Sequence, residues 1–296
     1  MKKLSVVLIA ALVLSFSAFA ATIHVPGGYP TIQAGIDAAV DGDTVLVADG
    51  TFTGIGNKNI DFTGKEIVVM SENGPETCII DCEDDGRGFY FHSGEDTSSV
   101  ISSMKIINGS ISYGGGIFCA VASSPIIDNC IITENNTTWG GGIYCQSNSS
   151  PIISNCDISR NSANWNGGGM YFSASSATII NCTIIENSAY NGYGGGIYLD
   201  VSNPIIENCT LSGSVGNYGG GIRCNGSNPN IINTIVENNT SGGIYFDGSS
   251  NSSINYSDFY NNEDGNFIGS IPVGLGIIAL INTNGDSCDQ FYNIFM

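Results

Sequence analysis

Three oxygen-bearing side chains and one arginine are the residues whose types and spacing suit metal-assisted chemistry. Asp200, Asn225 and Asp247 are separated by 25 and 22 residues, and Arg223 lies two positions before Asn225. Carboxylate and amide oxygens are the ligands that Ca²⁺ prefers in proteins. We therefore take the first three as candidate metal ligands and Arg223 as the candidate catalytic residue. The alternative is that Arg223 stacks on neighbouring tyrosines as a cation–π pair while the acids face solvent.

Aromatic side chains recur at two positions around a glycine-rich motif. The first row follows the glycines and comprises Phe118, Tyr144, Tyr171, Tyr198 and Tyr245; the second row precedes them and comprises Tyr113, Trp139, Trp165, Tyr193 and Tyr218. Aromatic faces beside polar side chains suit sugar rings, which offer apolar C–H faces and polar edges. The first row, with Trp139 and Trp165, therefore predicts an extended polysaccharide-binding surface. The alternative is that stacked rings stabilise neighbouring strands.

A repeat positions these side chains. The last glycine of the motif recurs at Gly116, Gly142, Gly169, Gly196, Gly221 and Gly243, in steps of 22 to 27 residues. A period in this range is typical of solenoids, propellers and repeat arrays. The unit has no helical periodicity, and its short runs of Ile, Thr, Tyr and Val lie between Gly, Asn and Ser-Ser-Pro. We therefore expect several short strands in each repeat.

The positions after the glycines indicate which side chains face inward. The first is always aliphatic and the third is always apolar, whereas the second, otherwise aromatic, admits Arg223. This alternation predicts a strand whose first and third residues enter a core and whose second residue points outward.

An asparagine also recurs once in each repeat, at Asn129, Asn155, Asn181, Asn208, Asn233 and, by extension, Asn255. Asparagine tolerates the left-handed backbone of tight corners and can form a ladder when it is stacked. Strands of this length, with asparagine at one corner and glycines at another, predict an all-β parallel β-helix of about 25 residues per coil.

The ten cysteines are placed by the same columns. Cys130, Cys156, Cys182 and Cys209 share one column, and the column of Cys119 is continued by Phe172 and Leu199. A position that exchanges Cys for Phe or Leu requires a buried apolar group, so we expect most of these thiols to be free. Cys78 and Cys82, in "CIIDC", are the best candidates for a disulfide, and both their free and bonded states stay open.

The two ends of the chain differ from the repeats. Residues 1–20 combine two lysines, an apolar run and a small-residue site, which predicts a signal peptide cleaved near Ala20 and a secreted or cell-surface location. Residues 21–43 predict a capping segment with a short helix that begins after Thr31 and buries Ile32, Ile36, Ala39 and Val40. Residues 44–296 then form the β-helix, starting at "GDTVLV". Its apolar end, "DQFYNIFM", predicts truncation at the C-terminus.

The charge balance restricts the partners. The chain carries a formal net charge of −19, and removal of Lys2 and Lys3 makes the mature chain more acidic. Nucleic acid is a poor partner for such a surface, because binding to it depends on Lys and Arg. No apolar segment of the mature chain is long and unbroken enough to predict a transmembrane helix. The expected partners are therefore polysaccharides or cell-surface glycans, and cations. We expect no required cofactor, and Ca²⁺ is the metal ion that Asp200, Asn225 and Asp247 would bind.

The segments "IHVPGGYPTIQAGIDAAVDGDTVLVADGTF", "GGGIY" and "SSPIIDNCII" resemble the pectin-lyase-like superfamily of right-handed parallel β-helices. The repeats are also similar to those of polymorphic outer-membrane proteins. The resemblance extends over almost all of the mature chain and implies the right-handed fold. It is weak for activity, because one fold serves many functions.

The resemblance also implies two enzymatic alternatives. A polygalacturonase would need paired carboxylates near Gly-His-Gly and Arg-Ile-Lys, and the chain has Asp84-Asp85 without either motif. A pectate lyase would use Ca²⁺ held by carboxylates and an arginine that removes a proton, a role for which Arg223 is the candidate. We favour a non-catalytic, exported or surface-attached protein that binds polysaccharide or mediates adhesion. A pectate-lyase-like enzyme is the alternative, and a purely structural stalk is the third interpretation.

Overall fold

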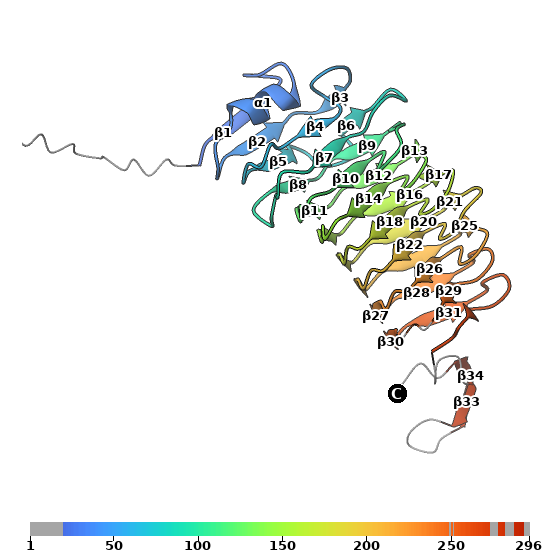
Figure 1. Ribbon diagram of the computed structural model, residues 1–296. Coiled ribbons are helices and arrows are strands. Elements are labelled where there is room, and N and C mark those ends of the chain that lie inside the picture. The colour runs from blue at the N-terminus through green and yellow to red at the C-terminus, as the bar shows by residue number, and fades with distance from the viewer. Residues whose placement is uncertain (1–19, 249, 251, 273–277, 282–286, 293–296) are drawn as a thin grey trace, which may run out of the picture.

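The computed structural model describes residues 20–248, 250, 252–272, 278–281 and 287–292, and the predicted signal peptide therefore lies almost entirely outside the described residues. The described chain is a stack of coils that forms a parallel β-helix with one short helix near its N-terminus (Figure 1). The predicted all-β class, the repeat and the parallel pairing are confirmed.

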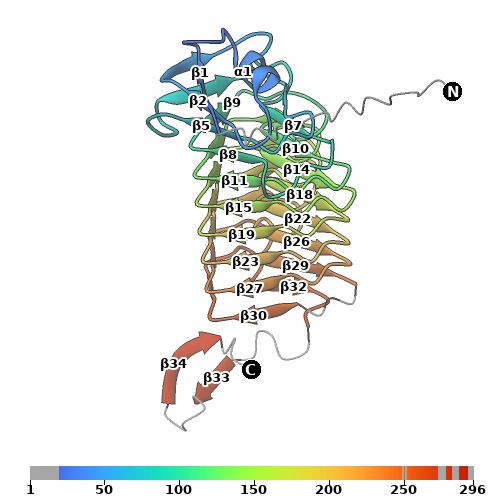
Figure 2. The same ribbon diagram turned by 90° about the vertical axis from the view of Figure 1, so that its left-hand side faces the viewer.

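The first long sheet, called sheet I, has ten parallel strands, one from each coil. Figure 2 shows it from β1 to β30 down the stack. Its strands are β1 (Thr22–Val25), β2 (Thr44–Val47), β5 (Val68–Ser71), β8 (Val100–Ser102), β11 (Ile126–Asp128), β15 (Ile152–Ser154), β19 (Thr178–Ile180), β23 (Ile205–Glu207), β27 (Asn230–Ile232) and β30 (Ser253–Asn255).

Sheet II carries the residues that follow the glycine motif. It contains nine parallel strands: β4 (Ile60–Asp61), β7 (Phe89–Phe91), β10 (Ile117–Cys119), β14 (Ile143–Gln146), β18 (Met170–Ser173), β22 (Ile197–Asp200), β26 (Ile222–Asn225), β29 (Ile244–Asp247) and β32 (Phe267–Gly269). The register joins Ile143 to Met170 and Tyr144 to Tyr171, so the columns read from the sequence are true strand neighbours.

Sheet III completes each coil with nine strands: β3 (Gly50–Phe52), β6 (Cys78–Asp81), β9 (Lys105–Ile107), β12 (Ile131–Thr133), β16 (Asp157–Ser159), β20 (Thr183–Ile185), β24 (Thr210–Ser212), β28 (Ile235–Glu237) and β31 (Asp258–Tyr260). A four-stranded sheet follows it: β13 (Asn136–Thr137), β17 (Ser162–Ala163), β21 (Ser188–Ala189) and β25 (Val215–Gly216). The hairpin of β33 (Ile278–Ile281) and β34 (Ser287–Tyr292) is antiparallel and separate from these sheets.

The N-terminal end of the stack is covered by α1 (Ile32–Ala38). The hydroxyl of Thr31 accepts a hydrogen bond from the backbone N–H of Ala34 at 3.2 Å, which confirms the predicted N-cap. Ile32 and Ile36 are fully buried. Val40 is exposed, contrary to prediction, because the helix ends at Ala38. The parallel pairing of β1 with β2 also starts the sheet one strand before the predicted "GDTVLV".

The core follows the predicted alternation. Both inward columns of sheet II are fully buried from Ile117 and Cys119 to Ile244 and Phe246. The inward isoleucines of sheet I, such as Ile153 and Ile179, have no exposed surface either. Burial of these stacked aliphatic side chains is the main favourable contribution to folding, at about 25 cal/mol for each Å² of apolar surface removed from water.

From Ile126 to Asn262 each coil turns three corners, and a left-handed residue at each corner is followed by an inward Ser, Thr, Asn or Cys side chain. At the first, serine hydroxyls accept backbone N–H groups from the preceding coil, as Ser175 does from Ser149 at 3.1 Å. At the second, Asn129, Asn155, Asn181, Asn208 and Asn233 have φ between 46° and 54°, which confirms their predicted role. The following residue is a cysteine, threonine or serine that continues the hydrogen-bonded column.

The third corner holds a buried amide ladder, which sequence reasoning missed. Its members are Asn135, Asn161, Asn187, Ser214, Asn239 and Asn262. Asn161 shows the pattern: its Oδ1 accepts from both the backbone N and the Nδ2 of Asn135, and its Nδ2 donates to Ile132 O at 2.8 Å and to Asn187 Oδ1 at 3.2 Å. The recurrent polar pair in "ENN", "RNS" and "ENS" was the available signal.

The glycine motif turns the chain from this ladder into sheet II. Gly140 has a φ of 61°, which glycine adopts without strain. Gly142 lies so close to the next coil that a Cβ atom would stand 2.8 Å from the carbonyl oxygen of Gly169 and 3.0 Å from Nδ2 of Asn161. The motif is therefore required by backbone conformation at its first glycine and by the absence of space at its third.

One sequence-based assignment is corrected, and one question that the sequence left open is decided. Asn255 pairs with Ile232, so the sixth corner residue is Tyr256, with a φ of 52°; the last coil is one residue out of the predicted register. Cys78 and Cys82 are buried free thiols, because four residues along an extended chain span roughly 13 Å, beyond the reach of a disulfide. The other cysteines of the described core are free and buried, as expected.

Candidate aromatic and arginine site

The outward face of sheet II brings the predicted aromatic residues into one column. Tyr90, Phe118 and Tyr144 are neighbours by strand register, and the column continues through Tyr171, Tyr198, Arg223 and Tyr245. The centroids of consecutive rings from Tyr90 to Tyr198 lie 4.8 to 5.3 Å apart. The structure therefore assembles the first row that the sequence predicted.

The exposure of this row differs from that of an open platform. Phe118, Tyr144 and Tyr198 retain only 6%, 6% and 7% of their surface in contact with solvent. The second row covers them: Tyr113 lies 6.1 Å from Phe118 and 5.3 Å from Tyr144, and Tyr193 lies 6.5 Å from Tyr198. Burial raises the pKa of the Tyr144 hydroxyl to about 12. These rings thus form a second apolar layer outside the sheet.

Solvent reaches the rings of the second row instead. Tyr113 is 39% exposed, and Trp165 and Tyr218 are each 47% exposed. Trp139 is half-buried against the first row and stacks on Tyr113 with centroids 5.2 Å apart. A ligand that meets this surface from outside would therefore touch second-row rings before most first-row rings.

Trp165 departs from the second row because of one inserted residue. Its backbone N–H donates to Thr138 O, but Asn166 stands between it and the glycines, and Gly140 N–H donates to Asn166 O at 3.0 Å. Within the described part of the chain, Trp165 makes no ring contact, in contrast to Trp139. The sequence carries the signal that separates the two tryptophans: Trp139 directly precedes the glycines in "TWGGG", whereas one residue stands between Trp165 and the glycines in "NWNGGG".

Arg223 is held inside this aromatic layer. Its guanidinium lies 4.2 Å from the ring centre of Tyr245, 5.1 Å from Tyr193 and 5.6 Å from Tyr218. Its Nη2 donates to Asp247 Oδ2 at 2.7 Å, and only 9% of its side chain is exposed. Arg223 thus stacks on neighbouring tyrosines, as the cation–π alternative predicted, and the carboxylate of Asp247 compensates its positive charge.

The three candidate metal ligands are neighbours by register, but the two aspartates among them already accept hydrogen bonds from other side chains. Asp200, Asn225 and Asp247 lie side by side on three successive strands. Asp200 Oδ1 accepts from the amide nitrogen of Asn225 at 2.8 Å, and Asp247 binds Arg223. The described residues contain no group of three or more His, Cys, Asp or Glu side chains arranged to hold a metal ion. Calcium at this position stays a prediction.

A second arginine, not singled out from the sequence, closes the other end of the layer. Arg87 lies 4.8 Å above the rings of both Tyr90 and Phe118. Burial lowers the pKa of its guanidinium. By register Gly88 corresponds to Gly116, so Arg87 stands where the next coil has Gly115, and a charged residue in place of a motif glycine was the available signal. Arg87 and Arg223 thus both lie over aromatic rings near opposite ends of the layer, but Arg223 is paired with an acid and lies within its strand, whereas Arg87 precedes β7.

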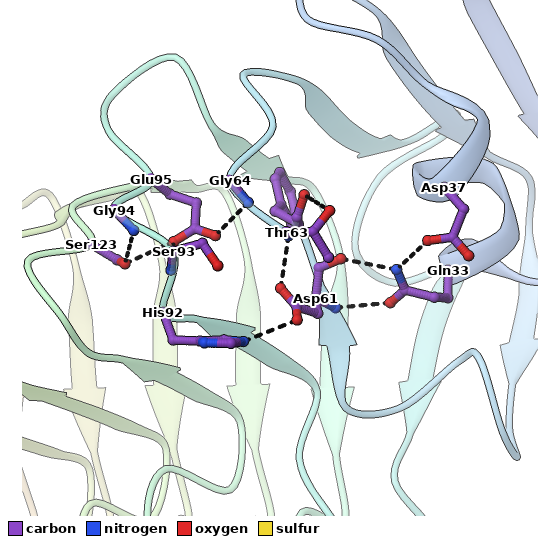
Figure 3. Close-up of polar contacts among 11 residues, drawn as sticks. Gln33, Asp37, Asp61, Thr63, Gly64, His92, Ser93, Gly94, Glu95 and Ser123 are labelled. Atoms are coloured by element: carbon purple, nitrogen blue, oxygen red, sulfur yellow. Dashed lines mark hydrogen bonds and ion pairs between the residues drawn. The ribbon is translucent and has the colours of Figure 1, made fainter.

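A polar cluster lies beyond Arg87, beneath the capping helix (Figure 3). His92 Nε2 and Asp61 Oδ2 are 3.0 Å apart, and Gln33 of α1 bonds the backbone of Asp61 in both directions. The buried carboxylate of Glu95 accepts from Gly64 N, Ser93 N and Ser123 Oγ. The contacts of Gln33 connect the capping helix to the first coils. Both carboxylate oxygens of Glu95 accept hydrogen bonds from the protein itself, which indicates a structural role for this side chain.

One shallow hollow of about 350 Å³ lies elsewhere, at the corner between sheets I and III. Its walls are Asn208, Cys209, Thr210, Asn233, Thr234, Ile235, Tyr256 and Asp258. Among the described residues no helix is long and apolar enough to cross a membrane.

Comparison with known proteins bears on the fold. The family model described as a right-handed β-helix region matches residues 34–192 and 173–277. Among solved structures, pectate lyase Pel9A is similar with a TM-score of 0.55 and 15% identity, over 84% of this chain and 75% of that chain. ORF18 of Geobacillus virus E2 has a TM-score of 0.30 and 14% identity, over 84% and 62% of the two chains. No curated protein matches. The predicted right-handed, pectin-lyase-like architecture is confirmed, and identities this low concern the fold alone.

Proposed function

Since this chain belongs to the family of right-handed β-helix proteins, we propose that it uses the outer face of sheet II to bind an extended polysaccharide without cleaving it. In this proposal the protein acts outside the cell or on its surface, where such polymers are found. Adhesion through a surface glycan is one consequence of the same binding.

The observation that carries the proposal is the pairing of aromatic and polar columns on one face. The exposed rings of Tyr113, Trp165 and Tyr218 border this face, and a polar column runs beside the first row through Gln146, Ser173, Asp200 and Asn225. Strands in a sheet are about 4.8 Å apart, so the polar column repeats at that interval along the solenoid, and the three exposed rings, which lie on every second coil, repeat at roughly twice that interval. A long, regular surface with apolar and polar strips matches a polymer better than a small ligand.

The surroundings of Arg223 favour binding over catalysis. A general base must reach the proton that it removes, and Arg223 is almost enclosed by three tyrosines and bonded to Asp247. The two aspartates that would hold Ca²⁺ already accept hydrogen bonds from Asn225 and Arg223. The pectate-lyase-like alternative would require all of these contacts to rearrange. A Ca²⁺-dependent rise in absorbance near 235 nm on polygalacturonate, which we do not expect, would establish it.

Affinity electrophoresis in gels that contain soluble polysaccharides tests the binding proposal. We expect retardation of the native protein, and its loss when Tyr113, Trp165 and Tyr218 are together replaced by Ala. Tyr260→Ala is the matched control, because Tyr260 is 40% exposed but lies on sheet III. Equal retardation of the triple variant and the control would refute binding at this face, and an absence of retardation in every gel would favour a structural stalk.

A further inference from the structure

We propose that one coil of this face forms a discrete subsite for a neutral sugar unit, at Tyr171 between Trp139 and Tyr193. This inference rests on the proposed polysaccharide binding and narrows it to a position and a chemical class of sugar.

The subsite begins with a break in the second row. The residue immediately before the glycines is Tyr113, Trp139, Asn166, Tyr193 and Tyr218 in five successive coils. Only the third is not aromatic. Its place is confirmed by the backbone, because Gly140 N–H donates to Asn166 O and Gly167 N–H donates to Tyr193 O. At the position just before the glycines, the nearest aromatic residues are therefore Trp139 one coil before Tyr171 and Tyr193 one coil after it, about 9.6 Å apart by strand spacing, while Trp165 is set back by one residue.

Burial shows the effect of this break on the first row. Tyr144 and Tyr198 are almost fully covered, whereas Tyr171 between them is only half-buried. The ring contacts found for Tyr171 are edge-to-face with those two neighbours, at 4.8 Å and interplanar angles of 70° and 89°. No second-row ring of the described chain packs on it. Tyr171 therefore keeps more of its surface in contact with solvent than the two first-row rings beside it.

A column of polar groups lies beside the ring of Tyr171. Ser173 lies two positions further along the same strand, and Gln146 and Asp200 pair with it on the adjacent strands. All three are half-buried. Asn166 fixes the edge of the break, because its Oδ1 accepts from Tyr193 N–H at 3.1 Å. A hydrophobic ring face flanked by convergent amide, hydroxyl and carboxylate groups is the usual composition of a sugar site.

Charge determines the class of sugar. Asp200 stands diagonally across from Tyr171, and the described face around it holds no basic side chain closer than Arg223, whose charge is balanced by Asp247. Burial first, and then the charge of Asp200, raise the pKa of Tyr171, and its hydroxyl is a hydrogen-bond donor at physiological pH, as that of an ordinary tyrosine is. Acidic sugars would add a like charge in a half-buried place, which is unfavourable. Neutral hexose or pentose polymers meet no such repulsion.

The chain contains its own reporter for this site. It has only two tryptophans: Trp139 lies one coil before Tyr171, and Trp165 lies in the turn that leads to Tyr171 in its own coil. Intrinsic fluorescence titration is therefore a local measurement, and isothermal calorimetry supplies the overall affinity. The probes are cellohexaose, xylohexaose and mannohexaose as neutral oligosaccharides and hexagalacturonate as the acidic one.

The decisive variant is Asn166→Tyr, which restores the missing aromatic residue and should cover Tyr171. We expect at least a tenfold weaker affinity for the neutral oligosaccharide that binds best, with an unchanged circular dichroism spectrum. Tyr171→Phe, which keeps the ring and removes the hydroxyl, should weaken binding several-fold and does not depend on the fold of the first variant. Tyr260→Ala is again the control.

The outcomes separate this inference from the proposed function. Neutral oligosaccharides that bind equally well to native protein, Asn166→Tyr and Tyr171→Phe would overturn the subsite and leave polysaccharide binding intact. Hexagalacturonate binding as tightly as the neutral probes would overturn the charge argument. If no oligosaccharide binds and no polysaccharide retards the protein, both proposals fail.

Discussion

The buried amide ladder offers the sharpest test of how the coils are held together. Asn161→Ala removes four side-chain hydrogen bonds: two from Asn135 to Oδ1 and two from Nδ2 to Ile132 O and Asn187 Oδ1. The backbone N–H of Asn135 loses its acceptor in a fully buried place. An unmet buried group costs about 1–3 kcal/mol, and the Ile132 carbonyl loses a donor as well. We therefore expect a loss of about 2–4 kcal/mol in the free energy of unfolding.

Urea unfolding followed by circular dichroism measures this loss, and hydrogen exchange locates it. The exchange of amides in β12, β16 and β20 should accelerate most, because a solenoid couples mainly to its nearest neighbours. Asn136→Ala is the matched control: it also removes an asparagine one residue from the ladder, but its side chain is exposed and accepts from Ser162 Oγ only. A cost of at most about 0.5 kcal/mol is expected there.

Asn161→Asp sharpens the same test. The change keeps the shape but replaces the Nδ2 donor by an oxygen that faces Ile132 O and Asn187 Oδ1. The variant should be at least as unstable as Asn161→Ala near neutral pH, because acceptors then face acceptors. Equal stability of Asn161→Ala and Asn136→Ala would refute the claim that the ladder, and not the apolar core alone, stabilises this corner.

Three further predictions concern other parts of the molecule. Arg223→Tyr restores the aromatic column. Its free energy of unfolding in urea should lie within about 1 kcal/mol of the native value, because a buried ion pair can often be replaced by a packed apolar side chain. A loss above about 3 kcal/mol would contradict this prediction. Cys156→Ser should be similarly tolerated, because the thiol of Cys156 already donates to Ser154 O at 3.1 Å and a hydroxyl can do the same. Cys119→Ser, in the apolar column of sheet II, should lower the free energy of unfolding by about 1–3 kcal/mol more, because it buries a hydroxyl among apolar side chains. Equal losses in urea unfolding would contradict this distinction between a hydrogen-bonded and an apolar cysteine column. Asp43 accepts backbone N–H bonds from Val40 and Ala21, and these bonds lower its pKa below that of an ordinary aspartate, so its stabilisation of the cap is present above the ordinary aspartate pKa and is lost as pH falls through the lowered one. Protection of the Val40 amide from hydrogen exchange should therefore fall in acid in the native protein but not in Asp43→Asn; the same acid-dependent loss in both proteins would contradict this assignment.

Much of the fold was predictable because a repeat samples each position several times. A single Ile117 or Cys119 says little, but a column that is apolar in every coil identifies the core, and Arg223 identifies the outward column between them. The same comparison located the asparagine corner. It failed at Asn255, where the register of the last coil shifts by one, because a column of corner residues has no burial pattern to align it.

The candidate site was predictable in membership but not in exposure. The sequence placed Tyr144 and Tyr198 outside the coil, and the structure confirms the direction of their side chains. It also shows that the second row folds down over them, which depends on the path of the turn before the glycines. Turn geometry is a property of backbone dihedral angles and of packing against the next coil, and residue type alone does not encode it.

By itself, the order of residues determined the period, the core, the parallel pairing and the outward aromatic column, because each of these requires only that like residues stack in register. The tertiary structure alone decided that Arg223 is enclosed by three rings, that Asn135 and Asn161 form a buried ladder, and that Tyr171 is less covered than Tyr144 and Tyr198. Those features depend on which groups of two neighbouring coils meet at distances of 3 to 6 Å. A one-residue insertion in a turn changes such meetings without changing the repeat.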